Sequence, residues 1–160
     1  MATEIERKFL TADESWRNQA ESSRMLCQGY LNDPGRASVR VRIDGEQANL
    51  NIKAAVKGAA RAEYEYPIPL ADARAMLAEL CMHPPVEKRR HLLRHGAHLW
   101  EIDEFAGANA GLVVAEVELG AVDEPFEKPA WLGSEVTELR RYYNHALAIT
   151  PYRDWPADER

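Results

Sequence analysis

The sequence predicts an α+β protein built on a closed or nearly closed β-barrel, with charged side chains inside it and helices packed outside. Segments with a charged or hydrogen-bonding residue at every second position recur along the chain, and that period is typical of strands. The alternate positions of these segments are apolar or aromatic. The sequence also predicts two amphipathic helices, which need an apolar surface to pack against. Only the apolar faces of the strands offer such a surface. The charged faces of the strands must therefore point into the barrel.

Length and composition set the class of protein. A chain of 160 residues fits one domain and can bury a real core. We expect a single domain over residues 1–150 and a short, loosely ordered tail over residues 151–160. No stretch approaches the roughly 18 to 20 apolar residues of a membrane span, and the N-terminus lacks the basic and apolar regions of a signal peptide. These features predict a cytoplasmic protein with no membrane partner.

Charge and cysteine content narrow the choice of partners. The formal net charge is -6, which argues against nucleic acid as the main partner, because binding to a phosphate backbone needs a basic surface. This net charge is compatible with a small polyanion bound in an internal site. Cys27 and Cys81 are too few for a disulfide framework and lack the spacing of a metal site, so we expect buried thiols.

The opening residues MATEIERK predict the first strand, with Glu4, Glu6 and Lys8 on one face. A capping-box pattern over residues 11–14 then predicts a short helix at about residues 12–21. The next segment, RMLCQGYLND, indicates a second strand that ends in an Asn-Asp-Pro-Gly turn. Gln28 and Tyr30 share one face of that strand.

A hairpin follows, with strands at about residues 38–43 and 48–54 joined across an Asp-Gly turn. Arg40 and Arg42 share a face of its first strand, and Lys53 lies on the charged face of the second. The segment RAEYEYPI then predicts a strand that places Glu63 and Glu65 together. Apolar residues at helical spacing in LADARAMLAELCMH predict a helix directly after it.

The second half of the chain repeats the pattern. VEKRRHLLRHGAHLWEIDEFAG predicts a hairpin that turns at His-Gly, with Lys88 and Arg90 on one face of its first arm. Glu101 and Asp103 share a face of the second arm. VVAEVELG places another acidic pair, Glu116 and Glu118, against apolar neighbours. A final helix is expected at about residues 138–148.

The inward set contains more acids than bases. Its acidic members are Glu4, Glu6, Glu63, Glu65, Glu101, Asp103, Glu116 and Glu118, and its basic members are Lys8, Arg40, Arg42, Lys53, Lys88 and Arg90. Burying so many ions is costly unless ligands compensate them. A divalent cation on the carboxylates and a polyanion on the bases would do so. Ligands that are all oxygen favour Mg²⁺ or Mn²⁺ over Zn²⁺, and arginine forks suit phosphate oxygens.

Nine short motifs in order carry a family resemblance. The segments EIERKFL, QGYL, VRVRI, LNIK, EYEYPI, EKRRH, EIDEF, AEVEL and EVTELRRYYNHAL run from Glu4 to about Ala148. Together they resemble the CYTH domain, also called the triphosphate tunnel metalloenzyme family, and in particular its short bacterial inorganic triphosphatases. An ExExK motif alone is weak, whereas the ordered set is highly specific.

The resemblance implies an eight-stranded antiparallel barrel that forms a tunnel, with a linear triphosphate on the basic residues and a metal on the acidic ones. The implied metal ligands are Glu4, Glu6, Glu116 and Glu118, with Glu63, Glu65 and Asp103 completing the acidic wall and a second metal site. The implied phosphate-binding residues are Lys8, Arg40, Arg42, Lys53, Lys88 and Arg90.

Hydrolysis of a phosphoanhydride depends mainly on positioning and charge neutralisation. We expect in-line attack of water on a terminal phosphoryl group, which gives pyrophosphate and phosphate from triphosphate. A second metal or a side-chain base would activate the water. Tyr30 would be that base if Lys88 lay against its hydroxyl group.

The same motifs are compatible with three other functions. One is an adenylate cyclase of the same fold, for which we expect an adenine contact upstream of ExExK, where only residues 1–3 precede Glu4. Another is a thiamine-triphosphate or nucleoside-triphosphate phosphatase. A module that binds polyphosphate without turnover would lack a metal carboxylate, and none is missing. Whether the barrel forms a homodimer is left open.

Overall fold

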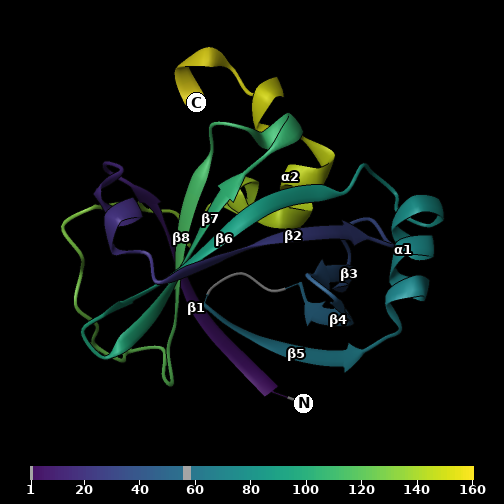
Figure 1. Cartoon of the computed structure of the whole chain (residues 1–160), viewed down its shortest axis with the longest axis horizontal. Coiled ribbons are helices and arrows are strands. Elements are labelled where there is room, and N and C mark those ends of the chain that lie inside the picture. Colours follow the sequence, from purple (N-terminus) through teal and green to yellow (C-terminus); the bar gives the residue numbers. More distant parts are fainter. Residues whose placement is uncertain (1, 56–58) are drawn as a thin grey trace.

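Eight antiparallel strands close into a barrel (Figure 1). A short ninth strand pairs beside the first. The computed structural model describes residues 2–55 and 59–160, and these contain the strands β1 (Ala2–Thr11), β2 (Ser22–Tyr30), β3 (Ala37–Asp44), β4 (Gln47–Ala54), β5 (Ala60–Pro67), β6 (Val86–His95), β7 (His98–Phe105), β8 (Val113–Glu118) and β9 (Leu132–Glu135). Their order is β5-β4-β3-β2-β6-β7-β8-β1-β9. Pairing of β1 with both β8 and β5 closes the ring. The predicted fold class is confirmed.

Strand register places the charged positions on the inner face. Glu6 lies opposite Glu118, and both Lys8 and Glu101 lie opposite Glu116. On the other side of the barrel, Arg40 of β3 lies opposite Tyr30 of β2, and both line the inner face. Side chains alternate along a strand, so a slip of one residue would turn a whole charged row outward. The apolar packing described next fixes this register.

The outer face of β6, β7, β8 and β1 is covered by aromatic side chains from the connecting segments. Trp16, from the 3-10 helix η1 (Ser15–Gln19), and Trp131, which precedes β9, pack there. The buried strand residues beneath them are Phe9, Leu93, Trp100, Ile102, Ala115 and Val117. The prediction that the backs of the strands form the core is therefore correct.

Helix α1 (Leu70–Glu79) covers another part of the outer face. It follows β5, as the sequence predicts, and lies at the edge of the barrel in Figure 1. Ala73 of α1 is fully buried against Val41 of β3 and Ala48 of β4. Both predicted hairpins are also present, and each turns through a glycine with positive φ, 62° at Gly45 and 59° at Gly96.

Two predicted helices are shorter than expected. The first is reduced to η1, and Asp13 rather than the predicted Thr11 accepts hydrogen bonds from the Ser15 backbone and hydroxyl. The last is split into the 3-10 helix η3 (Arg140–Tyr142) and α2 (Asn144–Ile149). Tyr143 between them is extended, and its hydroxyl donates to the Thr137 carbonyl at 2.6 Å. Tertiary contacts override local helix propensity here.

Residues 151–160, expected to form a loosely ordered tail, are mostly exposed, and Trp155 alone among them is buried. They form the 3-10 helices η4 (Tyr152–Asp154) and η5 (Ala157–Glu159). Trp155 is 6% exposed and packs edge-on against Tyr142, and Arg141 pairs with Glu159. With α2, this segment covers the barrel end where Val86, Phe105 and Val114 meet. A further 3-10 turn, η2 (Gly107–Asn109), lies between β7 and β8.

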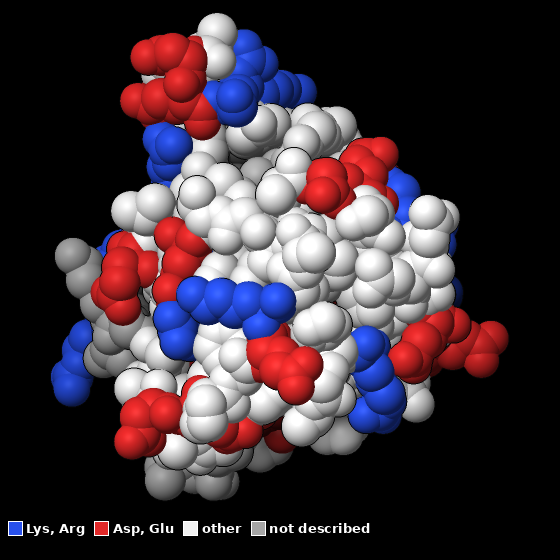
Figure 2. Space-filling view, turned by 90° about the vertical axis from the view of Figure 1, so that its left-hand side faces the viewer, with Lys and Arg blue, Asp and Glu red and all other residues white. Residues whose placement is uncertain are grey.

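The charged surface outside the barrel is mixed. Figure 2 shows small groups of both signs separated by uncharged surface on the face it displays. Within the described part of the chain, no helix has the length and apolar character that crossing a membrane requires.

Candidate active site

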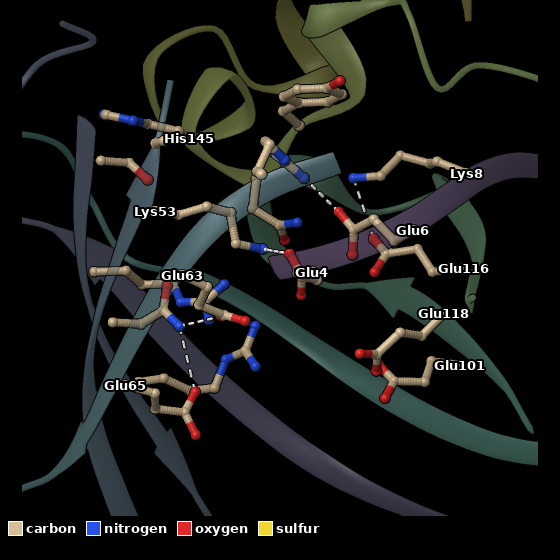
Figure 3. A pocket seen from close by; sticks show the side chains of 18 of the residues that line it. Glu4, Glu6, Lys8, Lys53, Glu63, Glu65, Glu101, Glu116, Glu118 and His145 are labelled. Carbon is tan, nitrogen blue, oxygen red and sulfur yellow. Dashed lines mark hydrogen bonds and ion pairs between the residues drawn. The ribbon is translucent and has the colours of Figure 1, made fainter. Parts of the chain in front are cut away.

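The inner faces of the strands surround one large cavity of about 840 Å³ (Figure 3). Most of the predicted site residues line it, namely Glu4, Glu6, Lys8, Tyr30, Arg40, Arg42, Lys53, Glu63, Glu65, Arg90, Glu116 and Glu118, together with Glu101. The first residues of α2 border it from the covered end of the barrel. Lys88 and Asp103 lie behind this lining, fully buried.

One wall of the cavity is basic and has no carboxylate partner. Gln28 accepts two hydrogen bonds from Arg42, at 3.0 Å from Nε and 2.9 Å from Nη2. Among the described residues, neither Arg42 nor Arg40 forms an ion pair, and Arg40 Nε has no hydrogen-bond partner. Burial, with Arg40 and Arg90 nearby, lowers the pKa of Arg42 to about 10. Crowded, buried cations of this kind stabilise a bound anion.

Behind the basic wall lies a buried network around Asp103. Arg90 holds its carboxylate with two bonds of 2.8 Å, and the Lys88 ammonium lies 2.5 Å from Oδ2. Lys88 also donates to the Asn144 side chain at 3.0 Å. Arg90 and Lys88 hold the pKa of Asp103 well below its usual range despite complete burial. Burial lowers the pKa of Lys88 to about 7, even though Asp103 raises it.

Tyr30 lines the cavity, but its expected pairing with Lys88 is not formed. Its hydroxyl accepts a hydrogen bond from Gln28 Nε2 at 3.0 Å, and no hydrogen bond joins it to Lys88 among the described residues. The ring stacks on His145 with centroids 4.2 Å apart and planes 4° apart. His145 Nε2 lies 2.9 Å from the Asn32 carbonyl. This stack fixes the orientation of the tyrosine ring.

The opposite wall is acidic, and each of three carboxylates is paired with its own base. Glu4 pairs with Lys53, Glu6 pairs with Arg61 at 2.5 Å, and Glu116 pairs with Lys8 at 3.1 Å. Glu118, which faces Glu101 in Figure 3, has no ion pair among the described residues. Partial burial, together with Glu4 and other carboxylates nearby, raises the pKa of Glu118.

The remaining acids are held by neutral or basic groups. Asn51 donates to Glu63 and, at 3.3 Å, to Glu65. Arg90 pairs with Glu101, and burial raises the pKa of Glu101. Glu63 and Glu65 thus extend the acidic wall onto β5, which pairs with β1, and Glu101 extends it onto β7, which pairs with β8.

The donor chemistry of the acidic walls fits a hard divalent cation, since carboxylate oxygens are what Mg²⁺, Mn²⁺ and Ca²⁺ prefer. Within the described residues, however, no three acidic, histidine or cysteine side chains converge closely enough to hold one ion. The cause is visible in the ion pairs: Glu4, Glu6 and Glu116 are each turned toward a base. Convergence on an ion therefore requires those bases to move.

Sequence reasoning missed several lining residues. Arg61 and Asn51 carry a signal, because each continues the spacing-two row of its strand, before Glu63 and before Lys53. The residues 143–146 also border the cavity. No local pattern indicates that the C-terminal segment folds over one end of the barrel.

Comparisons with known proteins agree with this geometry. A family model described as the CYTH domain matches residues 2–147. The chain is 39% identical over 155 residues to an inorganic triphosphatase of Acetivibrio thermocellus, covering 97% of this chain and 99% of that one. It is 37% identical over 152 residues to an inorganic triphosphatase of Nitrosomonas europaea, covering 92% and 98%.

Solved structures give the same result. A crystal structure of an inorganic triphosphatase superposes with a TM-score of 0.67 at 36% identity, covering 93% of this chain and 96% of that one. The family model and both relatives span nearly the whole chain, and the cavity has the charged walls that the motifs predict. This protein is a member of the CYTH domain family.

Proposed function

We propose that this chain hydrolyses inorganic triphosphate to pyrophosphate and phosphate inside the barrel. The observation that carries the proposal is the pair Arg40 and Arg42. Arg40 is buried and Arg42 partly buried, both lack a carboxylate partner among the described residues, and both face an acidic wall across one cavity. A short, linear polyanion bound with a divalent cation compensates both walls at once. Relatives named inorganic triphosphatases at 37% and 39% identity support this substrate.

The basic residues would hold the phosphates and stabilise the transferring phosphoryl group. Charge on the phosphate oxygens is the main quantity that such a site must neutralise. Arg40 and Arg42 present forks that can each bind two oxygens. The other proposed phosphate-binding residues at the cavity surface are Lys8, Lys53 and Arg90. Water attacks in line with the bond that breaks, and the product pyrophosphate leaves from the opposite side.

Membership of the CYTH family implies a divalent metal, and we propose that it is Mg²⁺ or Mn²⁺. Glu4, Glu6, Glu116 and Glu118 would hold it, with Glu63 and Glu65 on the adjoining strand β5 available for a second ion. When bound, such an ion neutralises phosphate oxygens and lowers the pKa of a coordinated water. Asp103 is not part of this proposal, because Arg90 and Lys88 already occupy both of its oxygens.

Tyr30 stays the proposed side-chain base for the attacking water, since it lines the cavity and is held by Gln28 and His145, although the Lys88 contact on which that role depended is not formed. Lys88 takes a different part from the one expected. It orients Asp103, which in turn fixes the fork of Arg90 toward the cavity. Lys88 is thus a positioning residue in this proposal.

The experiment is phosphate release measured in parallel from triphosphate, thiamine triphosphate and ATP, with Mg²⁺, with Mn²⁺ and with a chelator. Wild type is compared with Glu6→Gln and with the control Glu46→Gln, whose carboxylate lies in the exposed turn between β3 and β4. Metal-dependent release that prefers triphosphate, vanishes in Glu6→Gln and persists in Glu46→Gln supports the proposal.

Other outcomes would contradict it. Cyclic AMP formed from ATP would indicate a cyclase, and preference for thiamine triphosphate or ATP would indicate an organic-triphosphate phosphatase. Binding of triphosphate without release from any substrate would indicate a binding module. The cytoplasmic location, the single domain over residues 1–150 and a homodimer stay predictions.

A further inference from the structure

Arg61 is a cation of the cavity that the sequence motifs did not single out. It stands on β5 directly opposite Glu4 and shares the inner face of that strand with Glu63 and Glu65. Its side chain is 11% exposed, and Nη2 lies 2.5 Å from Glu6 Oε1, the contact drawn as a dashed line at Glu6 in Figure 3. A residue proposed to hold the metal is therefore bound by an arginine instead.

The Arg61 guanidinium is only partly satisfied. Its Nε is buried and has no hydrogen-bond partner among the described residues. A guanidinium has five N–H donors, and a buried donor without an acceptor costs free energy. The ion pair with Glu6 uses one edge of the group. The remaining N–H groups can donate to a second anion in the cavity.

Arg61 is also grouped with a residue of the proposed phosphate site. Its guanidinium carbon lies 5.0 Å from the centroid of the Tyr143 ring, and the Lys8 ammonium lies 4.9 Å from the same centroid. Arg61 and Lys8 are close enough to repel one another, although Glu116 and Glu6 outweigh burial and this repulsion and raise the pKa of Lys8. Two like charges around one ring gain stability from a shared anion.

We propose that Arg61 is a further phosphate-binding residue, which Glu6 holds by an ion pair until a divalent cation takes that carboxylate. A cation bound to Glu6 displaces Arg61, and the released fork then needs an acceptor, which the oxygens of triphosphate provide. Metal and triphosphate therefore bind with positive coupling through Arg61. This inference rests on the proposed function, because it assumes that the cavity takes both ligands.

Ion pairs of this kind also explain why the carboxylates of the acidic wall do not converge on one point. Lys53 at Glu4 and Lys8 at Glu116 are paired in the same way as Arg61 at Glu6. These bases thus neutralise three of the four carboxylates proposed to hold the metal. Arg61 is the most informative of the three to change, because Lys8 and Lys53 are already assigned to phosphate binding.

The test is a titration with Mn²⁺, followed by the electron paramagnetic resonance signal of the free ion. It is done on wild type, Arg61→Gln and Arg61→Lys, each with and without imidotriphosphate, an analogue that resists hydrolysis. Arg17→Gln is the matched control, because Arg17 forms an ion pair of equal length, 2.5 Å, with Glu104 on the surface. Circular dichroism checks that each variant is folded.

We expect Arg61→Gln to bind Mn²⁺ alone about fivefold or more tightly than wild type, since a competing positive charge has left the carboxylate. The gain in Mn²⁺ affinity from imidotriphosphate should be smaller in this variant than in wild type. Arg61→Lys keeps the charge but not the fork, so Mn²⁺ alone should bind nearly as in wild type and imidotriphosphate several-fold more weakly. Arg17→Gln should behave as wild type throughout.

Weaker or unchanged Mn²⁺ binding in Arg61→Gln would overturn the proposal, because it would make Arg61 a support for Glu6 rather than its competitor. If Arg61→Gln does not fold, unchanged imidotriphosphate binding in Arg61→Lys would overturn it. Absence of triphosphate hydrolysis in wild type would instead count against the proposed function. The Mn²⁺ titrations still report the competition for Glu6 in that case.

Discussion

Lys88 and Asp103 form an ion pair from which solvent is excluded, with both side chains 0% exposed and 2.5 Å between Nζ and Oδ2. Arg90 binds the same carboxylate through two further bonds. One carboxylate therefore pairs with two buried cations, of which Arg90 also pairs with Glu101. Because burying an unpaired charge is costly, the carboxylate is needed for folding as well as for placing Arg90.

We predict that Asp103→Asn lowers the free energy of unfolding by about 3 to 5 kcal/mol, the range for breaking a buried ion pair. Urea denaturation measures the loss. Asp44→Asn is the matched control, since Asp44 pairs with Arg24 at 2.7 Å on the surface and should cost no more than about 1 kcal/mol. Equal small losses in the two variants would show that the buried network is not needed for stability.

The raised pKa of Glu118 predicts how metal affinity depends on pH. Glu118 takes up its proton at a higher pH than an ordinary glutamate, because partial burial and the carboxylates around it oppose its negative charge. A protonated carboxyl group binds a cation poorly. Mn²⁺ affinity should therefore fall as the pH is lowered. The fall should begin at a pH above 4.5, which is the usual pKa of a glutamate.

Mn²⁺ titrations at several pH values check this dependence in wild type and in Glu118→Gln. The variant should bind more weakly at neutral pH and show a flatter profile, since the group that titrates has been removed. A profile in the variant parallel to that of wild type would mean that another group controls the pH dependence.

Tyr30→Phe tests the proposed base. If the hydroxyl accepts a proton in the reaction, the turnover of triphosphate should fall by about 10²-fold or more, while the KM changes little. Tyr66→Phe is the control, because Tyr66 is 53% exposed on the outer face of β5. Near-full turnover in Tyr30→Phe would leave the tyrosine only the role of packing on His145.

Trp155→Ala tests whether the C-terminal segment belongs to the folded core. Trp155 is 6% exposed and contacts the rings of Tyr142 and Tyr152, so its removal should cost about 3 to 5 kcal/mol of unfolding free energy. Val122→Ala, at a position that is 60% exposed, should cost well under 1 kcal/mol. A loss in Trp155→Ala as small as this would indicate that the tail contributes nothing to stability.

The barrel was predictable because its charge pattern has the period of a strand. Glu4, Glu6 and Lys8 show the pattern in a single segment, and its repetition requires the charged rows to face one another. Apolar residues on the alternate positions then indicate where helix α1 and the tryptophans pack. These relations are local, so the sequence alone conveys them.

Other features depend on contacts between distant residues. Whether Lys88 pairs with Tyr30 or with Asp103 is decided by the pairing of β6 with β7, which aligns Arg90 and Asp103. The partner of Glu6 comes from β5, 55 residues away along the chain. Tyr143 breaks the predicted last helix because its hydroxyl reaches Thr137. Period and composition do not specify such pairings.

The most direct test is a crystal structure of the chain grown with Mn²⁺ and imidotriphosphate. We predict the analogue inside the barrel, with phosphate oxygens on Arg40 and Arg42, and anomalous scattering from Mn²⁺ beside Glu6 and Glu116. An analogue bound on the outer surface, or Mn²⁺ located away from the inner carboxylates, would contradict the central claim that the inward-facing charges form the site.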